Sequence, residues 1–231
     1  MANNVLKVNG IAIASIAKIN GETDTDIAKL NGEEFTGVAD AHTFIRSEPA
    51  SADSSITFAH GTNGVVLDST YDVYEWHFIN MHPADRNYEF EFQVNYAGGS
   101  GFNETITSSY FNAGQNEGGQ SELFDYDAGY DQAQTANYQD LARGQENDND
   151  TGLSGVLTLY APSSTTYVKH FIASVHNVTR DHTGSDEWDY TLSNYAAGYI
   201  DTTNAIDEID FKFSSGNIDA GEIRMYGLAL S

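Results

Sequence analysis

A nine-residue stretch of strict alternation constrains the fold of this chain more than any other feature. Residues Tyr88–Tyr96 read YEFEFQVNY, so that apolar side chains occupy every second position and polar ones lie between them. Side chains of a β-strand point alternately to its two faces, and a period of two therefore predicts a strand with one buried and one polar face. We expect Tyr88, Phe90, Phe92 and Val94 to face the interior of a β-sandwich.

The same alternation of apolar and polar residues recurs along most of the chain. Tyr74, Trp76 and Phe78 alternate with polar residues, and the break Met81–Asn87, which contains Pro83, predicts a hairpin to the strand that follows. Further strands are predicted at 42–47, 55–58, 104–111, 154–160, 166–176, 188–200, 209–213 and 222–230. A weakly helical turn is expected only near Asp131–Leu141. These signals predict an all-β fold, an antiparallel two-sheet sandwich of the jelly-roll type.

The first 35 residues follow a different pattern. Lys7-Val8-Asn9-Gly10, Lys18-Ile19-Asn20-Gly21 and Lys29-Leu30-Asn31-Gly32 recur at an interval of 11 residues. Asn-Gly is a typical tight-turn pair because both residues tolerate positive φ, so each unit is predicted to be a strand and a turn. The period is lost near Phe35. We therefore predict an N-terminal repeat or docking segment at 1–35 and a jelly-roll domain at 36–231.

A strand-turn unit of this size has too little core to be stable alone. Its apolar side chains must therefore contact another surface, either copies of themselves or a partner protein. The residues expected to make this assembly contact are Val8, Ile11, Ile13, Ile16, Ile19, Ile27, Leu30 and Phe35. The corresponding expectation is a homo-oligomer, with a trimer favoured.

The composition excludes several classes of function. The chain has 34 acidic and 10 basic residues, a formal charge of -24, which disfavours nucleic-acid binding. It contains no cysteine, so disulfides and thiolate metal sites are excluded. No apolar stretch approaches the length of a membrane span, and we expect no membrane insertion.

No motif in the sequence indicates catalysis, and we expect neither enzymatic activity nor a cofactor. Pairs of acids such as Glu89 with Glu91 are present, but a strand places charges on its polar face in any case. Asn147-Asp148-Asn149-Asp150 concentrates oxygen ligands suited to calcium, although it lacks the ligand spacing of an EF-hand. An acidic, solvated loop is the competing interpretation of this segment, and no metal site is predicted from it.

Aromatic residues in polar surroundings suggest a different role. Flat rings beside hydrogen-bonding groups are how proteins hold sugar rings. The candidate glycan contacts are Tyr126, Tyr130, Tyr138, Trp188 and Tyr190. For Trp188 and Tyr190, an ordinary position in a sheet is an equally good interpretation.

Two parts of the sequence resemble structural proteins of tailed bacteriophages. One is the tandem K-[VIL]-N-G repeat with its Ile-Ala lead-in, within residues 5–35. The other is the C-terminal half, with SSTTYVKHF at 163–171, SSGNIDAG at 214–221 and the final Met225-Tyr226-Gly227. The resemblance implies a short N-terminal segment that docks on the particle, a lectin-like jelly roll displayed outside it, and assembly as an oligomer, commonly a trimer.

From this resemblance we expect a non-enzymatic virion protein on the exterior of the particle. The first hypothesis is a tail fibre or tail-associated appendage that contacts other virion proteins through its N-terminal segment and a host-surface glycan through its sandwich. A capsid decoration or head-fibre protein is the first alternative. A polysaccharide depolymerase is the second.

Overall fold

A computed structural model describes the chain at residues 42–119, 122–180 and 189–228, together with the backbone of six short strands before residue 42. The chain separates into two compact units, Met1–Ala41 and His42–Ser231. The prediction placed this boundary after residue 35.

The described residues of the N-terminal unit form three two-stranded antiparallel hairpins. They pair β1 (Lys7–Val8) with β2 (Ile11–Ala12), β3 (Lys18–Ile19) with β4 (Glu22–Thr23), and β5 (Lys29–Leu30) with β6 (Glu33–Glu34). In each hairpin the innermost partners, such as Val8 and Ile11, leave only an Asn-Gly pair between them, the loop length typical of tight β-hairpins. Of the predicted assembly residues, Val8, Ile11, Ile19 and Leu30 lie in these strands, whereas Ile13, Ile16, Ile27 and Phe35 lie outside the described residues.

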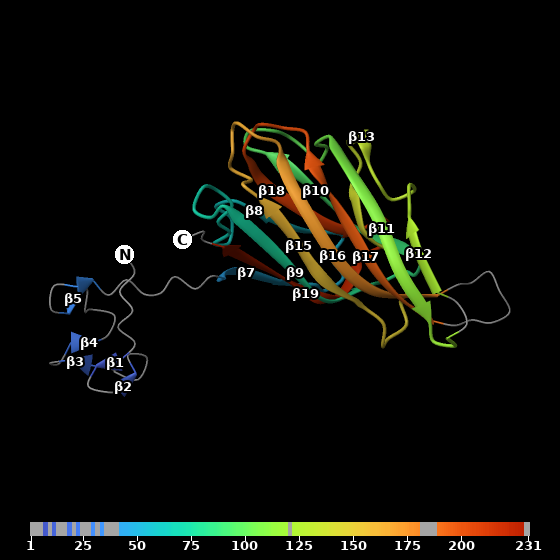
Figure 1. Ribbon diagram of the computed structural model, residues 1–231, viewed down its shortest axis with the longest axis horizontal. Helices are drawn as coiled ribbons and strands as arrows, with labels where there is room; N and C mark the ends of the chain where they lie inside the picture. The colour runs from blue at the N-terminus through green and yellow to red at the C-terminus, as the bar shows by residue number, and fades with distance from the viewer. Residues whose placement is uncertain are drawn as a thin grey trace. The chain divides into compact units, whose positions relative to one another are not determined.

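The second unit is a sandwich of two antiparallel sheets, which confirms the predicted fold class (Figure 1). The large sheet has the order β12 (Glu122–Tyr126), β11 (Ile106–Asn116), β17 (Asp189–Ile200), β16 (Lys169–Arg180), β15 (Leu153–Tyr160), β9 (Val73–Pro83), β19 (Ile218–Leu228) and β7 (Thr43–Pro49), with β13 (Ala133–Thr135) also pairing with β11. The small sheet has the order β14 (Gln139–Gln145), β10 (Tyr88–Tyr96), β18 (Ile206–Phe213) and β8 (Ile56–Ala59).

The chain repeatedly crosses from one sheet to the other. The strands β7, β9, β11, β15 and β19 belong to the large sheet, whereas β8, β10, β14 and β18 between them belong to the small one. The predicted hairpin between 74–78 and 88–96 is therefore wrong: β9 pairs with β15 and β19, and β10 pairs with β14 and β18. Both strands have an apolar face, and they bury these faces against each other across the core instead of side by side.

Aromatic rings from both sheets fill the core. Phe78 of β9 contacts Phe90 of β10 with ring centroids 5.1 Å apart, and Phe78 lies 5.2 Å from Phe211 of β18. As predicted, Phe90, Phe92 and Val94 are fully buried, whereas Tyr88 and Tyr96 at the strand ends are half-buried. The polar face of β10 is also covered, because Gln93 and Asn95 are buried.

The described residues contain no helix, so the helical turn expected near Asp131–Leu141 is wrong. This segment instead forms β13 and the start of β14, and the Gln139 side chain donates to the carbonyl of Tyr130 and accepts from the hydroxyl of Ser108. These side-chain bonds hold an extended segment against the large sheet, which outweighs the weak local helix propensity. In the described part of the chain, no helix is long and apolar enough to cross a membrane.

Candidate functional site

The outer face of the small sheet is polar and partly covered by two loops. The Gln93 side-chain amide of β10 donates to the carbonyl oxygens of Glu104 (3.0 Å) and Asn137 (2.9 Å). One residue thereby anchors the loop after β10 and the loop before β14. Because these loops lie over the sheet without closing on it, they leave a groove along its outer face.

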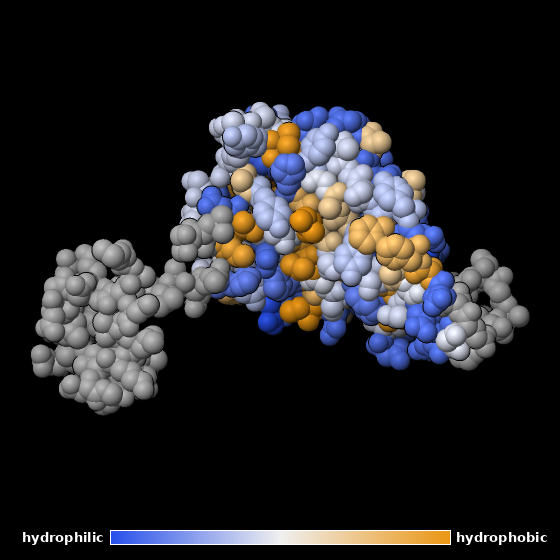
Figure 2. All heavy atoms as spheres, in the orientation of Figure 1, coloured by the Kyte–Doolittle hydropathy of each residue, from blue (hydrophilic) through white to orange (hydrophobic). Residues whose placement is uncertain are grey.

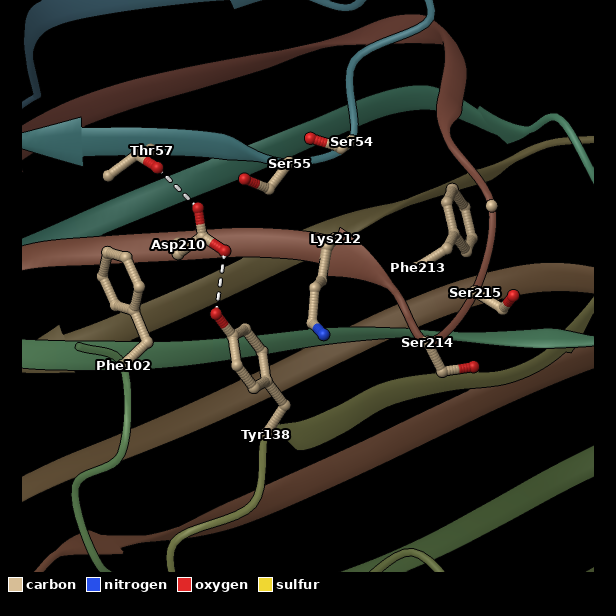
Figure 3. Close-up of a pocket in the computed structure, with 11 residues that line it drawn as sticks. Ser54, Ser55, Thr57, Phe102, Tyr138, Asp210, Lys212, Phe213, Ser214 and Ser215 are labelled. Atoms are coloured by element: carbon tan, nitrogen blue, oxygen red, sulfur yellow. Dashed lines mark hydrogen bonds between the residues drawn. The ribbon is translucent and has the colours of Figure 1, made fainter.

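The groove consists of two adjoining hollows of about 450 and 820 Å³. The smaller hollow lies over β8 and β18 and is lined mainly by serines and aromatic residues, while the larger one extends towards β14 and the loop 128–137. Both are lined by Phe102, Tyr138, Lys212 and Ser214. Figure 3 shows Phe102 and Tyr138 on either side of Asp210, with Lys212 directed into the space beside them.

Asp210 organises the floor of this groove. Its side chain is buried and accepts hydrogen bonds from Thr57 Oγ1 of β8 (2.5 Å) and from the Tyr138 hydroxyl (3.0 Å), both drawn in Figure 3. Lys212 Nζ lies 4.2 Å from the centroid of the Tyr138 ring, a cation–π distance. Burial, followed by the Asp210 carboxylate, raises the pKa of Tyr138, so its hydroxyl stays protonated and acts as a donor.

Two carboxyl groups lie next to each other on the same face. Glu91 of β10 and Asp140 of β14 are directly opposite in the antiparallel register, and Glu91 Oε1 lies 3.2 Å from Lys212 Nζ. Burial, followed by the charges of Glu91 and Glu89, raises the pKa of Asp140 to about 8. Burial also raises the pKa of Glu91, although Lys212 opposes this effect. At neutral pH this end of the groove therefore holds a neutral carboxylic acid beside an ion pair.

The five predicted glycan contacts are not brought together. Tyr138 lines the groove, but Tyr130 packs its half-buried ring against Tyr110 at 5.4 Å. Tyr126 is exposed on β12 of the large sheet, where its hydroxyl donates to Asp131. Tyr190 lies at the start of β17, and Trp188 lies outside the described residues. Of the four members of the set that the structure describes, only Tyr138 lines the groove.

Sequence reasoning missed Phe102, Asp210 and Lys212. A signal for two of them was present: Asp210 and Lys212 alternate with Ile209, Phe211 and Phe213, so they must share the polar face of one strand. Phe102 had no such signal, because it lies in an irregular loop between β10 and β11. Its position in the groove depends on how that loop folds over the sheet.

The acidic segment 147–150 does not gather its side chains round one point. Asp148 Oδ2 lies 2.9 Å from Arg180 Nη2, and Asn147 Nδ2 donates to the carbonyl of Ala84. Across the described ranges, no three His, Asp or Glu side chains are placed so that they could hold a metal ion. Asp148 therefore takes part in an ion pair that ties this loop to the end of β16.

The concentration of acids on the small sheet predicts a salt effect on stability. Glu89, Glu91 and Asp210 lie close together, with Lys212 among them, in a chain of charge -24. Salt screens such repulsion, so we expect the melting temperature to rise from low to moderate sodium chloride. Differential scanning calorimetry checks this, with calcium at matched ionic strength as the control. A flat or falling melting temperature would contradict it.

Comparison of the chain with protein-family models, with curated proteins and with solved structures gives no significant match.

Proposed function

We propose that this chain is a non-enzymatic structural protein of a bacteriophage virion, of the tail-fibre or tail-appendage type, and that its sandwich contacts a host-surface glycan. The proposal rests on the groove of the small sheet, where aromatic rings lie beside hydrogen-bonding groups that a polyhydroxylated ligand needs. The proposal also includes a segment that docks on the particle, and the hairpin repeats of the N-terminal unit support this part of it. The assignment to a virion itself rests on the sequence resemblance.

The charges of the groove restrict the glycan to a neutral one. Glu91, Asp131 and Asp210 line it or its floor, against a single lysine among the lining residues, Lys212. A sialic acid or uronic acid would bring a further carboxylate into this field, at a cost that rises as water is excluded. A neutral hexose or N-acetylhexosamine offers hydroxyl donors to Asp210 and Glu91 and a ring face to Phe102 without that cost.

Binding of neutral glycans is therefore expected, and it should depend on the Tyr138 ring. The full chain should bind neutral polysaccharides on a glycan array and leave polyuronic or sialylated ones unbound. Tyr138→Ala should weaken binding at least about tenfold, the loss typical of a ring that stacks on a sugar, whereas Tyr138→Phe keeps the ring and should retain most of the affinity. Isothermal titration with the best neutral oligosaccharide measures both effects.

A matched control is available on the same chain. Tyr167 is 71% exposed and lies outside the groove lining, so Tyr167→Ala should leave the affinity unchanged. Equal losses in Tyr138→Ala and Tyr167→Ala, or selective binding of acidic glycans, would contradict the groove as the site. Thermal melts of all three variants exclude unfolding as the cause.

The first alternative is a capsid decoration or head-fibre protein. It would use the same sandwich at another place on the particle, and antibody labelling of intact virions distinguishes the two positions.

The second alternative is a polysaccharide depolymerase. One observation favours it: the carboxyl groups of Glu91 and Asp140 face each other, and glycosidases use such a pair. The test is whether the protein releases reducing sugar from a polysaccharide. If it does, and if Glu91→Gln abolishes the release, the protein is a depolymerase and the proposed binding function is wrong.

A further inference from the structure

Four neighbouring strands of the large sheet, β11, β17, β16 and β15, have an outer face that is almost free of charge. At the outward positions of β11, β15, β16 and β17 the described strands carry serine, threonine, alanine, glutamine, histidine, β-branched and aromatic residues. The exceptions are Arg180 and Asp189 at the strand ends, which pair with each other at 2.6 Å. Figure 2 shows this band of apolar and weakly polar residues across the middle of the face. We call it the neutral face.

On β9 and β19 of the same sheet, acids lie beside basic or histidine partners, and the edge strand β12 carries two exposed acids, Glu122 and Asp125. Glu222 of β19 is paired with Arg224 at 2.9 Å, and Glu75 of β9 lies 3.0 Å from His42 and 2.9 Å from His77. The small sheet differs, because Glu89, Glu91, Asp140 and Asp210 gather there around one lysine. The sandwich thus has an acidic side and a neutral side, although composition alone would spread a charge of -24 over both.

The neutral face also exposes large apolar side chains. Ile172 at its centre is 52% exposed, and Phe111 and Tyr195 are 37% and 38% exposed. Ala197, its partner in the pairing register, and Ser174, the next outward residue of β16, are small and allow another backbone to approach closely. A flat surface of this kind, with small residues around an exposed isoleucine, is suited to packing against another sheet.

The arrangement of the rings argues against a sugar as the occupant of the neutral face. Phe111 and Tyr195 stack on each other, with centroids 5.0 Å apart and planes 14° apart. Each ring therefore covers one flat face of the other. Each ring therefore offers a sugar at most one flat face, whereas a protein partner can pack against ring edges as well as against faces.

The size of the neutral face matches what a stable pair of proteins needs. Strands lie about 4.8 Å apart, and outward positions follow one another every ~6.8 Å along a strand, so four strands with about five such positions cover roughly 650 Å². Phe124 and Tyr126 of β12 add to this area, since both are exposed and pair in register with residues of β11. Standard interfaces bury about 800 Å² on each partner.

We propose that the neutral face is the surface on which two copies of this chain pack, sheet against sheet. Two molecules that each carry a charge of -24 can associate only where few acids meet, and the described residues of the sandwich provide such a surface on the large sheet. Each copy must use the same face, because any other pairing would bury the acids of one copy against the other. This contact is separate from the oligomer proposed for the N-terminal repeats.

The absence of cysteine allows a direct test on the full chain. Ser174→Cys introduces a single thiol at an exposed outward position of β16, and Thr62→Cys introduces one in the exposed turn after β8. The rate of maleimide labelling of the first variant should fall at least about tenfold from dilute to concentrated protein, while that of the second stays constant. The readout reports the sheet itself, so association through the repeats does not affect it.

A second substitution separates the contact from general charge repulsion. Ile172→Glu and Ile172→Lys, each added to Ser174→Cys, should both abolish the protection, because either charge would be buried without a partner. If repulsion between the net charges alone limited association, Ile172→Lys would strengthen the association, because the substitution lowers the net negative charge. Thermal melts establish that both variants fold.

Two results would overturn the proposal. One is labelling of the Ser174→Cys variant at the rate of the Thr62→Cys variant at every concentration, which would leave the face without a second copy. The other is protection that persists in dilute monomer, which would mean that a part of the same chain covers the face.

Discussion

Phe90→Ala is expected to lower the free energy of unfolding by about 3–5 kcal/mol, the usual cost of emptying a core aromatic position. Phe90 is fully buried, and its ring contacts Phe78 at 5.1 Å, Phe213 at 5.2 Å and Phe211 at 6.2 Å. These contacts come from two strands, β9 of the large sheet and β18 of the small one, so the structure cannot collapse onto the cavity without moving a whole strand. Urea denaturation followed by tryptophan fluorescence measures the loss, since Trp76 lies in the same core.

Phe124→Ala is the matched control for this change. Phe124 is 75% exposed on the edge strand β12, and its removal in dilute protein should change the stability by less than about 1 kcal/mol. A loss below 1 kcal/mol for Phe90→Ala as well would show that the inner face of β10 does not pack against β9 as described.

The second large effect is a fall in stability as the pH rises from about 5 to 8. The folded protein raises the pKa of Asp140 to about 8, whereas an unfolded aspartate titrates near 4. Between these values the folded state holds a proton that the unfolded state has released, so raising the pH favours unfolding. The full shift would correspond to about 5 kcal/mol, and water in the groove reduces the expected change to about 2 kcal/mol.

Asp140→Asn should remove most of this pH dependence. Asparagine cannot ionise, so the variant should gain stability over the parent at pH 8 and differ little from it at pH 5. Asp150→Asn makes the same charge change at an exposed position and should keep the parent's slope. Chemical denaturation at several pH values provides the measurement. A parent protein that is equally stable at pH 5 and pH 8, or an unchanged slope in Asp140→Asn, would show that Asp140 ionises as in water.

The groove was predictable only in part. Tyr138, which was predicted as an aromatic residue in polar surroundings, lines the groove, whereas Tyr126 has the same local signal and lies on the other sheet. What separates them is the path of the chain between β12 and β14, which Gln93 fixes by binding the carbonyl of Asn137. A side-chain bond over 44 positions along the chain leaves no local pattern.

The amino-acid sequence was sufficient to predict the class of fold and which residues are buried together. Alternation at Phe90, Phe92 and Val94 and at Ile209, Phe211 and Phe213 placed these residues on inward faces, because the two-residue period of a strand is a local property of the backbone. The Asn-Gly pairs likewise marked the three hairpins, since the loop length selects the turn.

Which strands pair with each other, and which residues surround each polar face, became known only from the tertiary structure. Nothing local distinguishes a hairpin of β9 and β10 from a crossing between sheets, since both bury the same apolar residues. The strands that flank them, β15 and β18, come from much later in the chain, and their pairing separates an acidic groove from a neutral face. Periodicity shows which side chains share a face, whereas the neighbours of that face depend on contacts between distant segments.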